Sequence, residues 1–392
     1  RVNAAGRMGS AERALKLLLT EDVNEAKEIA EEVSNANAQR QATETEITAS
    51  AIEYIENAPE IKHKRVIVVE GDDWHQGVIG IVASRLVERY GKPCIVISKG
   101  GDVAKGSGRS IDGFSLYDAL SYCSDILVQY GGHVLAAGLT VDSDKIDAFR
   151  EKINEYAVNT EAAVPTLKID CKLNPSSINV DMLSSLQVLE PYGAENPQPL
   201  FGLYNMEITA IQPVGAGKHL RITVKRKNSI VTVIMFSVTL EEFPYKVGDT
   251  VDLAVKLSEN EFQGKVQVSI QAKAIKLSGV DDDEAIASIH AYEDFCAEES
   301  ISDDLKNKIS VNRELCGSVY KFVKANNGWN FSAEVLCYRL GLSPKQIAAC
   351  QISLDALTEL GILNLKDGKY TIPAQTVKNP LENSKIFQKI AL

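Results

Sequence analysis

Four short clusters in the first part of the chain combine glycines with residues that can bind phosphate. They are NAAGRMG at 3–9, GDDWHQGVIG at 71–80, GSGRS at 106–110 and GGHVLAAG at 131–138. Glycine lets a ligand approach the main chain closely, arginine can hold two phosphate oxygens at once, and histidine can donate a proton near neutral pH. Together, the four clusters predict a site for a phosphate group.

Each cluster contributes candidates to this predicted phosphate site. Arg7 and Arg109 are expected to hold phosphate oxygens, and His133 to donate to a non-bridging or leaving oxygen. The segment GVIG at 77–80 opens a helical pattern whose N-terminus can receive an anion. Further candidates for phosphate contacts are Asn3, His75, Ser107, Gly108, Ser110, Gly131 and Gly132.

Several of these residues also have ordinary structural interpretations. Arg109 can be a surface arginine in a glycine turn, and the Gly-Gly-His stretch, predicted to be a ligand-facing turn, can be a tight connection. His75 can cap the helix that begins near Gly77. Asp72 and Asp73 are expected to be cap residues rather than metal ligands.

Metal-binding patterns are missing from the sequence. Phosphodiester hydrolysis commonly uses two metal ions held by several Asp and His residues. The five histidines, at 63, 75, 133, 219 and 290, are far apart and form neither an Asp-His-His nor a His-x-x-x-His arrangement. A P-loop and a Gly-x-Ser-x-Gly motif are also missing. We therefore expect no metal site within this chain.

The elements that must position the four clusters alternate between strands and helices. Residues 10–58 have helical spacing and many polar positions, which predicts long helices that connect domains. The segments 65–71, 77–91 and 93–100 read as strand, helix and strand, a β-α-β unit. Helices are expected at 115–123 and 143–157. An α/β domain at 59–158 and a linker at 159–166 follow from this pattern.

Residues 167–277 change to short alternating strands with glycine-bearing turns, which predicts a small β-barrel. The segment KHLRITVKRK at 218–227 places apolar residues on one face of a strand and basic residues on the other. Such a face suits a sugar-phosphate backbone, and an aromatic ring can stack on a base. The candidates are Lys218, His219, Arg221, Lys225, Arg226, Lys227 and Phe262. The alternative is a solvated strand face with a structural phenylalanine.

The last part of the chain has a different pattern. Residues 278–309 are predicted to be an acidic linker, and 310–392 a winged-helix-like domain of helices and a hairpin that turns at Asp367-Gly368. The stretch 343–361 occupies the place of a recognition helix, but it carries only one lysine and two acidic residues. A packing or protein-interaction role is therefore favoured over reading of a DNA groove.

Composition limits the classes of protein that remain. The chain has 392 residues, enough for several domains, and its net charge of −11 confines any contact with nucleic acid to local basic patches. Seven cysteines without a Cys-x-x-Cys pair favour reduced thiols. Because no apolar run is long enough for a membrane helix and no secretory signal opens the sequence, we expect a cytoplasmic location and no membrane partner.

Five motifs, in order, resemble segments of a known family. They are RVNAAGRMG, GDDWHQGVIGIVASRL, GSGRSI, YGGHVLAAGLTV and LEPYGAENPQPLF. They are similar to the bacterial RecJ family of single-strand-specific DNA exonucleases, within the DHH phosphoesterase superfamily, over residues 1 to about 277. The resemblance implies metal-dependent removal of nucleotides from a 5′ end in recombination and repair, with Mn²⁺ or Mg²⁺ held by a catalytic domain that precedes NAAGR.

The resemblance also assigns parts of this chain. Residues 1–9 match the end of the catalytic domain, 10–58 connecting helices, 59–158 the DHH-associated domain and 167–277 an oligonucleotide-binding (OB) barrel. His133 and the two glycines before it match the Gly-Gly-His that faces the scissile phosphate, Ser107 to Ser110 the substrate-phosphate loop, and Arg7 a phosphate contact. The chain alone is then expected to bind single-stranded DNA without cutting it.

Two other interpretations remain. One is a non-catalytic DNA-binding or scaffold relative, and the other is a phosphodiesterase for short oligonucleotides. The partners implied by the resemblance are single-stranded DNA and, through the C-terminal domain, single-strand-binding protein or other repair proteins.

Overall fold

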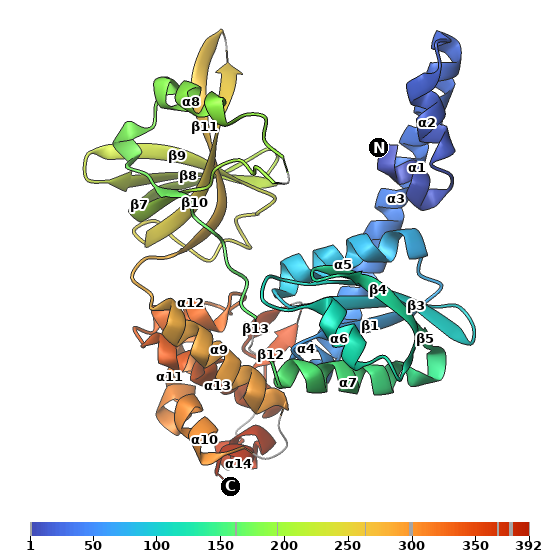
Figure 1. Ribbon diagram of the computed structural model, residues 1–392. Helices are drawn as coiled ribbons and strands as arrows, with labels where there is room; N and C mark the ends of the chain where they lie inside the picture. Colours follow the sequence, from blue (N-terminus) through green and yellow to red (C-terminus); the bar gives the residue numbers. More distant parts are fainter. Residues whose placement is uncertain are drawn as a thin grey trace. The chain divides into compact units, whose positions relative to one another are not determined.

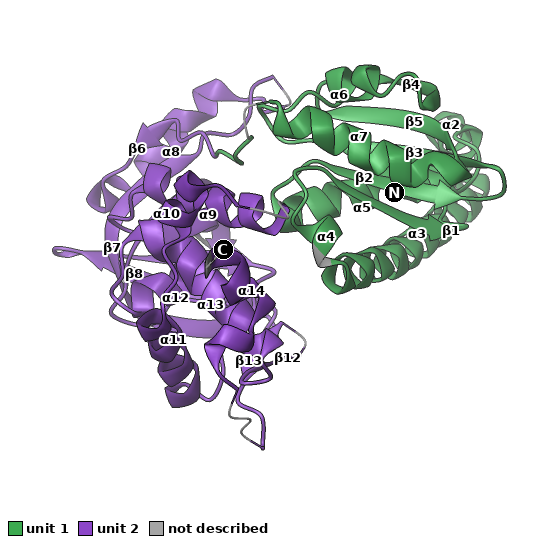
Figure 2. Cartoon of the chain, turned by 90° about the horizontal axis from the view of Figure 1, so that it is seen from below, with its two compact units in different colours: residues 1–166 green, residues 167–392 purple. Residues whose placement is uncertain are grey.

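The computed structural model describes residues 2–160, 163–193, 195–262, 264–297, 301–366, 368–375 and 379–391, with the backbone alone at 59, 262, 265 and 391. The chain divides into two compact units, residues 1–166 and 167–392 (Figure 2). Within the described part, none of the helices is long and apolar enough to cross a membrane.

The first unit begins with four helices, α1 (Val2–Met8), α2 (Glu12–Leu19), α3 (Val23–Asn57) and α4 (Pro59–Lys62). Asp22 caps α3 by accepting hydrogen bonds from the amides of Asn24 and Glu25. The first half of α3 buries Ile29 and Val33 against α1 and α2, and its second half joins the core below α5 (Gln76–Tyr90). The expected connecting helices are thus present.

A mixed sheet of five strands follows, in the order β1-β2-β3-β5-β4 (Figure 1). Its strands are β1 (Ile67–Asp72), β2 (Cys94–Lys99), β3 (Val103–Arg109), β4 (Leu127–His133) and β5 (Ala136–Asp142). β1 and β2 are parallel and joined through α5, as the β-α-β pattern predicts, whereas the other pairs are antiparallel. The helices α6 (Leu116–Tyr122) and α7 (Ile146–Val158) complete this α/β domain.

The two faces of the sheet are covered unequally. One face packs on α6 and α7, with Ile95, Ile97, Leu116 and Phe149 in its core. On the other face, α3 and α5 bury Val69, Val96 and neighbouring residues of β1 and β2. On β4 and β5 that second face stays accessible, since Gly131, His133 and Gly138 are exposed.

Two glycine clusters expected as turns lie on strands instead. GSGR forms the end of β3, and the Gly-Gly-His stretch forms the end of β4. Glycine is a turn signal only when no neighbouring strand pairs with it, and here the ladder continues through both segments. Gly106 and Gly108 face the core, where Leu139, Ile95 and Leu116 approach within 3.2 Å of the place of a Cβ atom.

The second unit opens with a closed five-stranded barrel, as expected for an OB fold. Its strands are β7 (Phe201–Val214), β8 (His219–Arg226), β9 (Ser229–Phe236), β10 (Thr250–Phe262) and β11 (Lys265–Leu277), with the short β6 (Cys171–Lys172) beside β7. An antiparallel β10–β7 pair and a parallel β9–β11 pair close the barrel. The helix α8 (Val180–Leu186) contributes Leu183 to the barrel core.

The C-terminal domain contains helices where a linker was expected. Residues 278–309 include α9 (Asp282–Ala297) and α10 (Asp303–Ile309), so the prediction of an acidic linker is wrong. Acidic residues occupy the first turn of each helix, where they stabilise its N-terminus. Farther along, Phe295, Leu305 and Ile309 are buried against Ile352. The acidic residues that suggested a linker therefore lie in the first turns of two helices.

The rest of the domain is α11 (Arg313–Ala325), α12 (Ala333–Arg339), α13 (Ile347–Glu359), the hairpin β12 (Asn364–Lys366) and β13 (Lys369–Thr371), and α14 (Lys385–Ala391). This order matches the winged-helix expectation, although Asp367 lies outside the described residues. The helix in the place of a recognition helix, α13, is a core element, with Ile352, Leu354 and Ala356 fully buried. Its less buried residues, Gln351, Asp355, Thr358 and Glu359, include no basic side chain, which favours a packing role over contact with DNA.

Candidate functional site

The N-terminus of α5 is built from a histidine cap and a glycine contact. The Nδ1 atom of His75 accepts a hydrogen bond from the Gly77 amide at 3.1 Å, so the capping interpretation of His75 holds. A Cβ atom at Gly77 would lie 2.2 Å from the Arg7 carbonyl oxygen. Only glycine at position 77 therefore lets α1 lie so close to α5, and this contact brings Arg7 to the start of α5.

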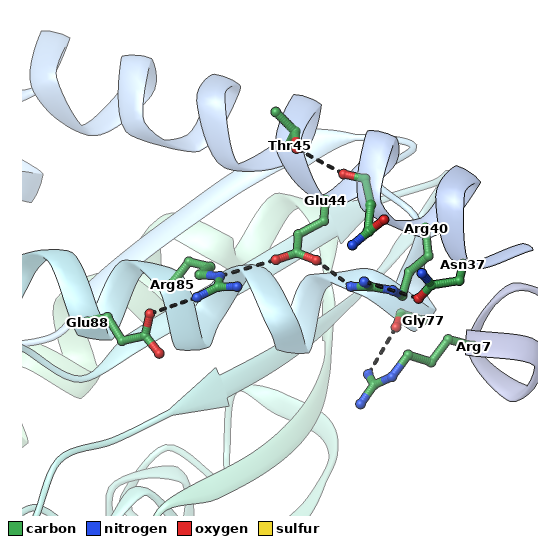
Figure 3. Close-up of polar contacts among 9 residues, drawn as sticks. Arg7, Asn37, Arg40, Glu44, Thr45, Gly77, Arg85 and Glu88 are labelled. Carbon is green, nitrogen blue, oxygen red and sulfur yellow. Dashed lines mark hydrogen bonds and ion pairs between the residues drawn. The ribbon is translucent and has the colours of Figure 1, made fainter. Parts of the chain in front are cut away.

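Two arginines meet beside this helix start. Arg7 Nη1 donates to the Gly77 carbonyl at 3.3 Å (Figure 3). The guanidinium of Arg109 lies over Gly80, and Nη2 would be 3.1 Å from a Cβ atom at that position. Burial lowers the pKa of Arg109, and the positive charge of Arg7 lowers it further. The second effect shows that the two positive charges repel each other.

Other arginines nearby are neutralised, whereas this pair is not. Glu44 bridges Arg40 and Arg85, and Arg85 also pairs with Glu88 at 3.1 Å (Figure 3). In the described part of the chain, neither Arg7 nor Arg109 lies within 4.0 Å of a carboxylate. Guanidinium groups without a carboxylate partner beside a helix N-terminus have the chemistry that anion binding needs, so this place is the candidate phosphate site.

The register of the strands places further candidate residues on the same face of the sheet as Arg109. Arg109 on β3 and His133 on β4 both lie opposite Ala136 of β5. Residues directly opposite each other share a face of the sheet, and a separation of two strands is roughly 10 Å. Ser107, Gly138 and Gly131 form the next row in the same way. The exposed glycines leave main chain open between Arg109 and His133.

The structure separates the predicted phosphate residues into two groups. Arg7, Arg109, Ser107, Gly131 and His133 lie at or beside this accessible face. Asn3 is exposed on α1, and no contact in the described residues connects it to the site.

Three predicted residues have structural roles instead. Ser110 donates its hydroxyl proton to the Phe114 carbonyl at 2.8 Å, which uses the donor that a phosphate would need. Gly108 faces the core. Gly132 has a φ of 149°, and a Cβ atom there would lie 2.4 Å from the Ala136 carbonyl. Side chains of the core crowd the Cβ position of Gly108, and backbone atoms crowd that of Gly132.

The two aspartates before α5 do not cap it. The Oδ1 atom of Asp72 lies 3.4 Å from Lys99 Nζ, and the Asp73 amide donates a hydrogen bond to the Lys99 carbonyl at 2.8 Å. The capping expectation for both is wrong, because His75 occupies the cap position. Sequence reasoning also missed Lys105, which is exposed and shares the face of Ser107 and Arg109. Every second residue of VAKGSGR is small and buried, and this alternation indicated that Lys105, Ser107 and Arg109 share one face of a strand.

A donor set for a metal ion does not occur among the residues that the structure describes. In that part of the chain, no three or more His, Cys, Asp and Glu side chains are grouped so that they could hold an ion. The described residues therefore do not fit a divalent metal.

The second predicted site is the outer face of the barrel. Leu220, Ile222 and Val224 are fully buried, which places the alternate residues of β8 outward as predicted. Lys225 pairs with Glu207 of β7 at 3.1 Å, so part of its charge is neutralised. The remaining predicted cations, which form no ion pair among the described residues, are Lys218, Arg221, Arg226 and Lys227.

An aromatic residue that sequence reasoning missed completes this face. Phe236 of β9 is 49% exposed and lies directly opposite His219, with 5.0 Å between the ring centres and an angle of 68°. The Ser237 amide donates to His219 Nδ1 at 2.9 Å, which fixes the histidine ring. The side chain of Phe262, the aromatic residue that was predicted, lies outside the described residues. The alternation of β9, with Val233 buried and Phe236 outward, was the signal for Phe236.

Comparisons with known proteins agree with these two domains. Residues 63–159 match the DHHA1 domain and residues 169–274 the RecJ OB domain. The single-stranded-DNA-specific exonuclease RecJ of Bacillus subtilis is 34% identical over 284 residues, which are 71% of this chain and 36% of that protein. The RecJ of Escherichia coli is 32% identical over 69% of this chain and 48% of that protein.

Solved structures show the same relationship. The crystal structure of Thermus thermophilus RecJ with Mn²⁺ has a TM-score of 0.60 and 32% identity, over 71% of this chain and 41% of that one. The structure of the same protein with Mg²⁺ has a TM-score of 0.59 and 31% identity, over 74% and 46%. This chain thus spans less than half the length of these relatives. Within that span, the DHHA1 domain, the OB domain and the fold all agree, and the chain belongs to the RecJ family.

Proposed function

We propose that this chain is the part of a single-strand-specific DNA exonuclease that holds the DNA and grips its phosphates. The complete enzyme would remove nucleotides from a 5′ end by hydrolysis that uses Mn²⁺ or Mg²⁺, in recombination and repair. A bound metal would supply an activated water and polarise the phosphoryl group. Because the described residues offer no donor set for the metal, every role assigned below belongs to phosphate and base binding.

The observation that carries the phosphate proposal is the pair Arg7 and Arg109. Their charges repel each other, no carboxylate neutralises them among the described residues, and Arg109 is partly buried. A phosphate between them would relieve the repulsion and accept charge-assisted hydrogen bonds from both guanidinium groups. Ser107 would add a hydroxyl donor, since its Oγ lies 3.4 Å from Arg109 Nη1.

His133 is proposed to contact the same or the next phosphate from the other side of Ala136. It is exposed at the end of β4, beside the open main chain of Gly131. An imidazole at this place can donate a hydrogen bond to a phosphate oxygen and stabilise the charge that develops there during hydrolysis.

The barrel is proposed to hold the single strand. OB folds bind single strands through a cationic groove combined with rings on which bases stack. On this barrel, Arg221 supplies an unpaired cation, and the ring pair of His219 and Phe236 supplies the stacking surface. A duplex keeps its bases stacked inside, so a face that depends on stacking selects for single strands.

The double variant Arg7→Ala/Arg109→Ala tests the phosphate proposal. We expect it to bind a 5′-phosphorylated single strand at least about tenfold more weakly, since hydrogen bonds to charged groups contribute about 1.5–3 kcal/mol. Arg85→Ala is the matched control, because Arg85 on α5 is already paired with Glu44 and Glu88. Equal affinities of the double variant and the wild type would reject the assignment.

A partner protein at the C-terminal domain and the cytoplasmic location stay predictions.

A further inference from the structure

Four exposed lysines between residues 313 and 371 form no ion pair among the described residues of the C-terminal domain. Seven basic residues lie between 313 and 371. Three of them are paired: Arg313 with Glu382, Arg339 with Asp249 and Lys345 with Glu284. The other four are exposed and form no ion pair among the described residues; they are Lys321, Lys324, Lys366 and Lys369. The same stretch holds five acidic residues, at 314, 334, 355, 359 and 367, so seven basic minus five acidic residues give it a net charge of +2 in a chain whose net charge is −11.

Local contacts bring these four lysines to one side of the domain. Lys321 and Lys324 lie one turn apart at the end of α11, and the helix ends in a turn where the Gly328 amide donates to the Val323 carbonyl at 2.9 Å. The aliphatic part of Lys369 lies over Gly328, where Cε would be 2.7 Å from a Cβ atom. Lys366 stands opposite Lys369 in the hairpin. We name these four residues the wing-lysine patch.

The wing-lysine patch adjoins the segment that leaves the barrel face. Trp329, next to Gly328, pairs with Tyr370 of the hairpin, and the following residue, Asn330, donates to the Glu241 carbonyl at 3.1 Å. Glu241 is only five residues beyond Phe236, at most about 17 Å of extended chain. This path of chain and hydrogen bond bounds the separation between Phe236 and the part of the C-terminal domain that carries the patch.

The junction between the barrel and the C-terminal domain is well fixed. Arg339 of α12 donates two hydrogen bonds to Asp249, both at 2.6 Å, and a third to the Pro244 carbonyl at 3.2 Å. Both charged side chains are nearly buried, with 12% and 5% of their surface exposed. This bidentate pair links the C-terminal domain directly to the barrel.

We propose that the wing-lysine patch binds phosphates of the same single strand beyond the barrel face and so lengthens the binding site. This inference rests on the proposed role of the barrel. Because α13 is buried, the domain cannot read bases in a groove, and its contribution is to the phosphate backbone. The added contacts do not depend on base sequence but do depend on salt.

The test compares the triple variant Lys324→Ala/Lys366→Ala/Lys369→Ala with the wild-type chain. The probes are labelled single strands of about 8 nucleotides, within the range that one OB fold covers, and of about 20 nucleotides. Affinities are measured by anisotropy across a salt series. With the long strand, the slope of log K against log salt should become shallower by about 2, since each phosphate contact to a single strand contributes about 0.7. The short strand should bind both proteins equally.

The triple variant with arginine at the same three positions is the matched control, and it should bind the long strand like the wild type. An unchanged slope of the alanine variant with the long strand overturns the proposal, and so does an equal loss with both strands. Failure of the proposed barrel function is distinguishable, since the wild type would then not bind the short strand at all. A patch that binds an acidic peptide and no DNA would also reject the proposal.

Discussion

At the scale of single residues, His133 is either a ligand contact or part of the structure, and its exposure separates the two. It is exposed at the end of β4. We predict that His133→Ala changes the free energy of unfolding by less than about 1 kcal/mol while it weakens binding of single-stranded DNA. Chemical denaturation and anisotropy on the same samples check this. A large loss of stability with unchanged binding would show that the histidine is structural.

Gly77 provides a prediction about the geometry that brings Arg7 to the site. A methyl group at position 77 would meet the Arg7 carbonyl at 2.2 Å, so Gly77→Ala must push α1 away from α5. We expect a loss of about 1–3 kcal/mol in unfolding free energy, the usual cost of overpacking. Gly131→Ala is the control, because no atom lies within 4 Å of its Cβ position. Equal melting temperatures of the two variants would contradict the contact of α1 with α5.

Some of the candidate site residues could be predicted from the sequence, and others could not. Arg7, Arg109 and His133 were predicted because four glycine-rich clusters with arginine or histidine occur together in the first part of the chain and match motifs of a known family. The sequence could not show that the Ser110 hydroxyl donates to the Phe114 carbonyl or that Gly108 faces the core, because both contacts join residues whose positions depend on the folded backbone. Phe236 was missed because its partner His219 lies in another strand.

At the scale of elements, the outer face of β8 and β9 is the part of the barrel that should bind bases. Phe236→Ala is predicted to weaken binding of single-stranded DNA by about 1–3 kcal/mol, the contribution of one stacked base, without changing the salt slope. Anisotropy titrations at several salt concentrations measure both quantities. Phe236→Trp retains an aromatic ring and should restore the affinity. Loss of affinity in both variants would point to a packing role for this ring.

The elements themselves were largely predictable, because hydrophobic period is a local property. The alternation in residues 219–226 and the helical spacing of residues 77–90 gave the correct element at each place. Glycine-rich strands were mistaken for turns, since their pairing with β5 depends on residues far along the chain. The acidic segment at 278–309 was mistaken for a linker, because its few buried residues pack only against α13 and its neighbours.

At the scale of the whole second unit, the ion pair of Arg339 and Asp249 joins two domains. Burial acts to raise the pKa of Asp249, but hydrogen bonds from Arg339 outweigh it and hold that pKa below its usual value. A carboxyl group whose pKa is lowered by folding stabilises the protein above its unfolded pKa of about 3.9. That stabilisation is lost as the pH falls toward the lower folded value.

We therefore predict that Arg339→Ala separates the unfolding of the barrel from that of the C-terminal domain. Removal of one partner of a buried pair costs about 3–5 kcal/mol, because it leaves a charge without compensation. Calorimetry should show two transitions in the variant where the wild-type unit shows one. The difference from wild type should shrink as the pH approaches 3. A single transition at an unchanged temperature would contradict the role of this pair in joining the domains.

The central claim is that this chain holds single-stranded DNA through its barrel and phosphate site and does not itself cut it. Fluorescence anisotropy with single-stranded and duplex oligonucleotides across a salt series, together with a nuclease assay in manganese on the same samples, tests this most directly. We predict salt-sensitive binding that prefers single strands, and intact oligonucleotides after incubation. Equal affinity for duplex, absence of binding, or cleavage by the chain alone would contradict it.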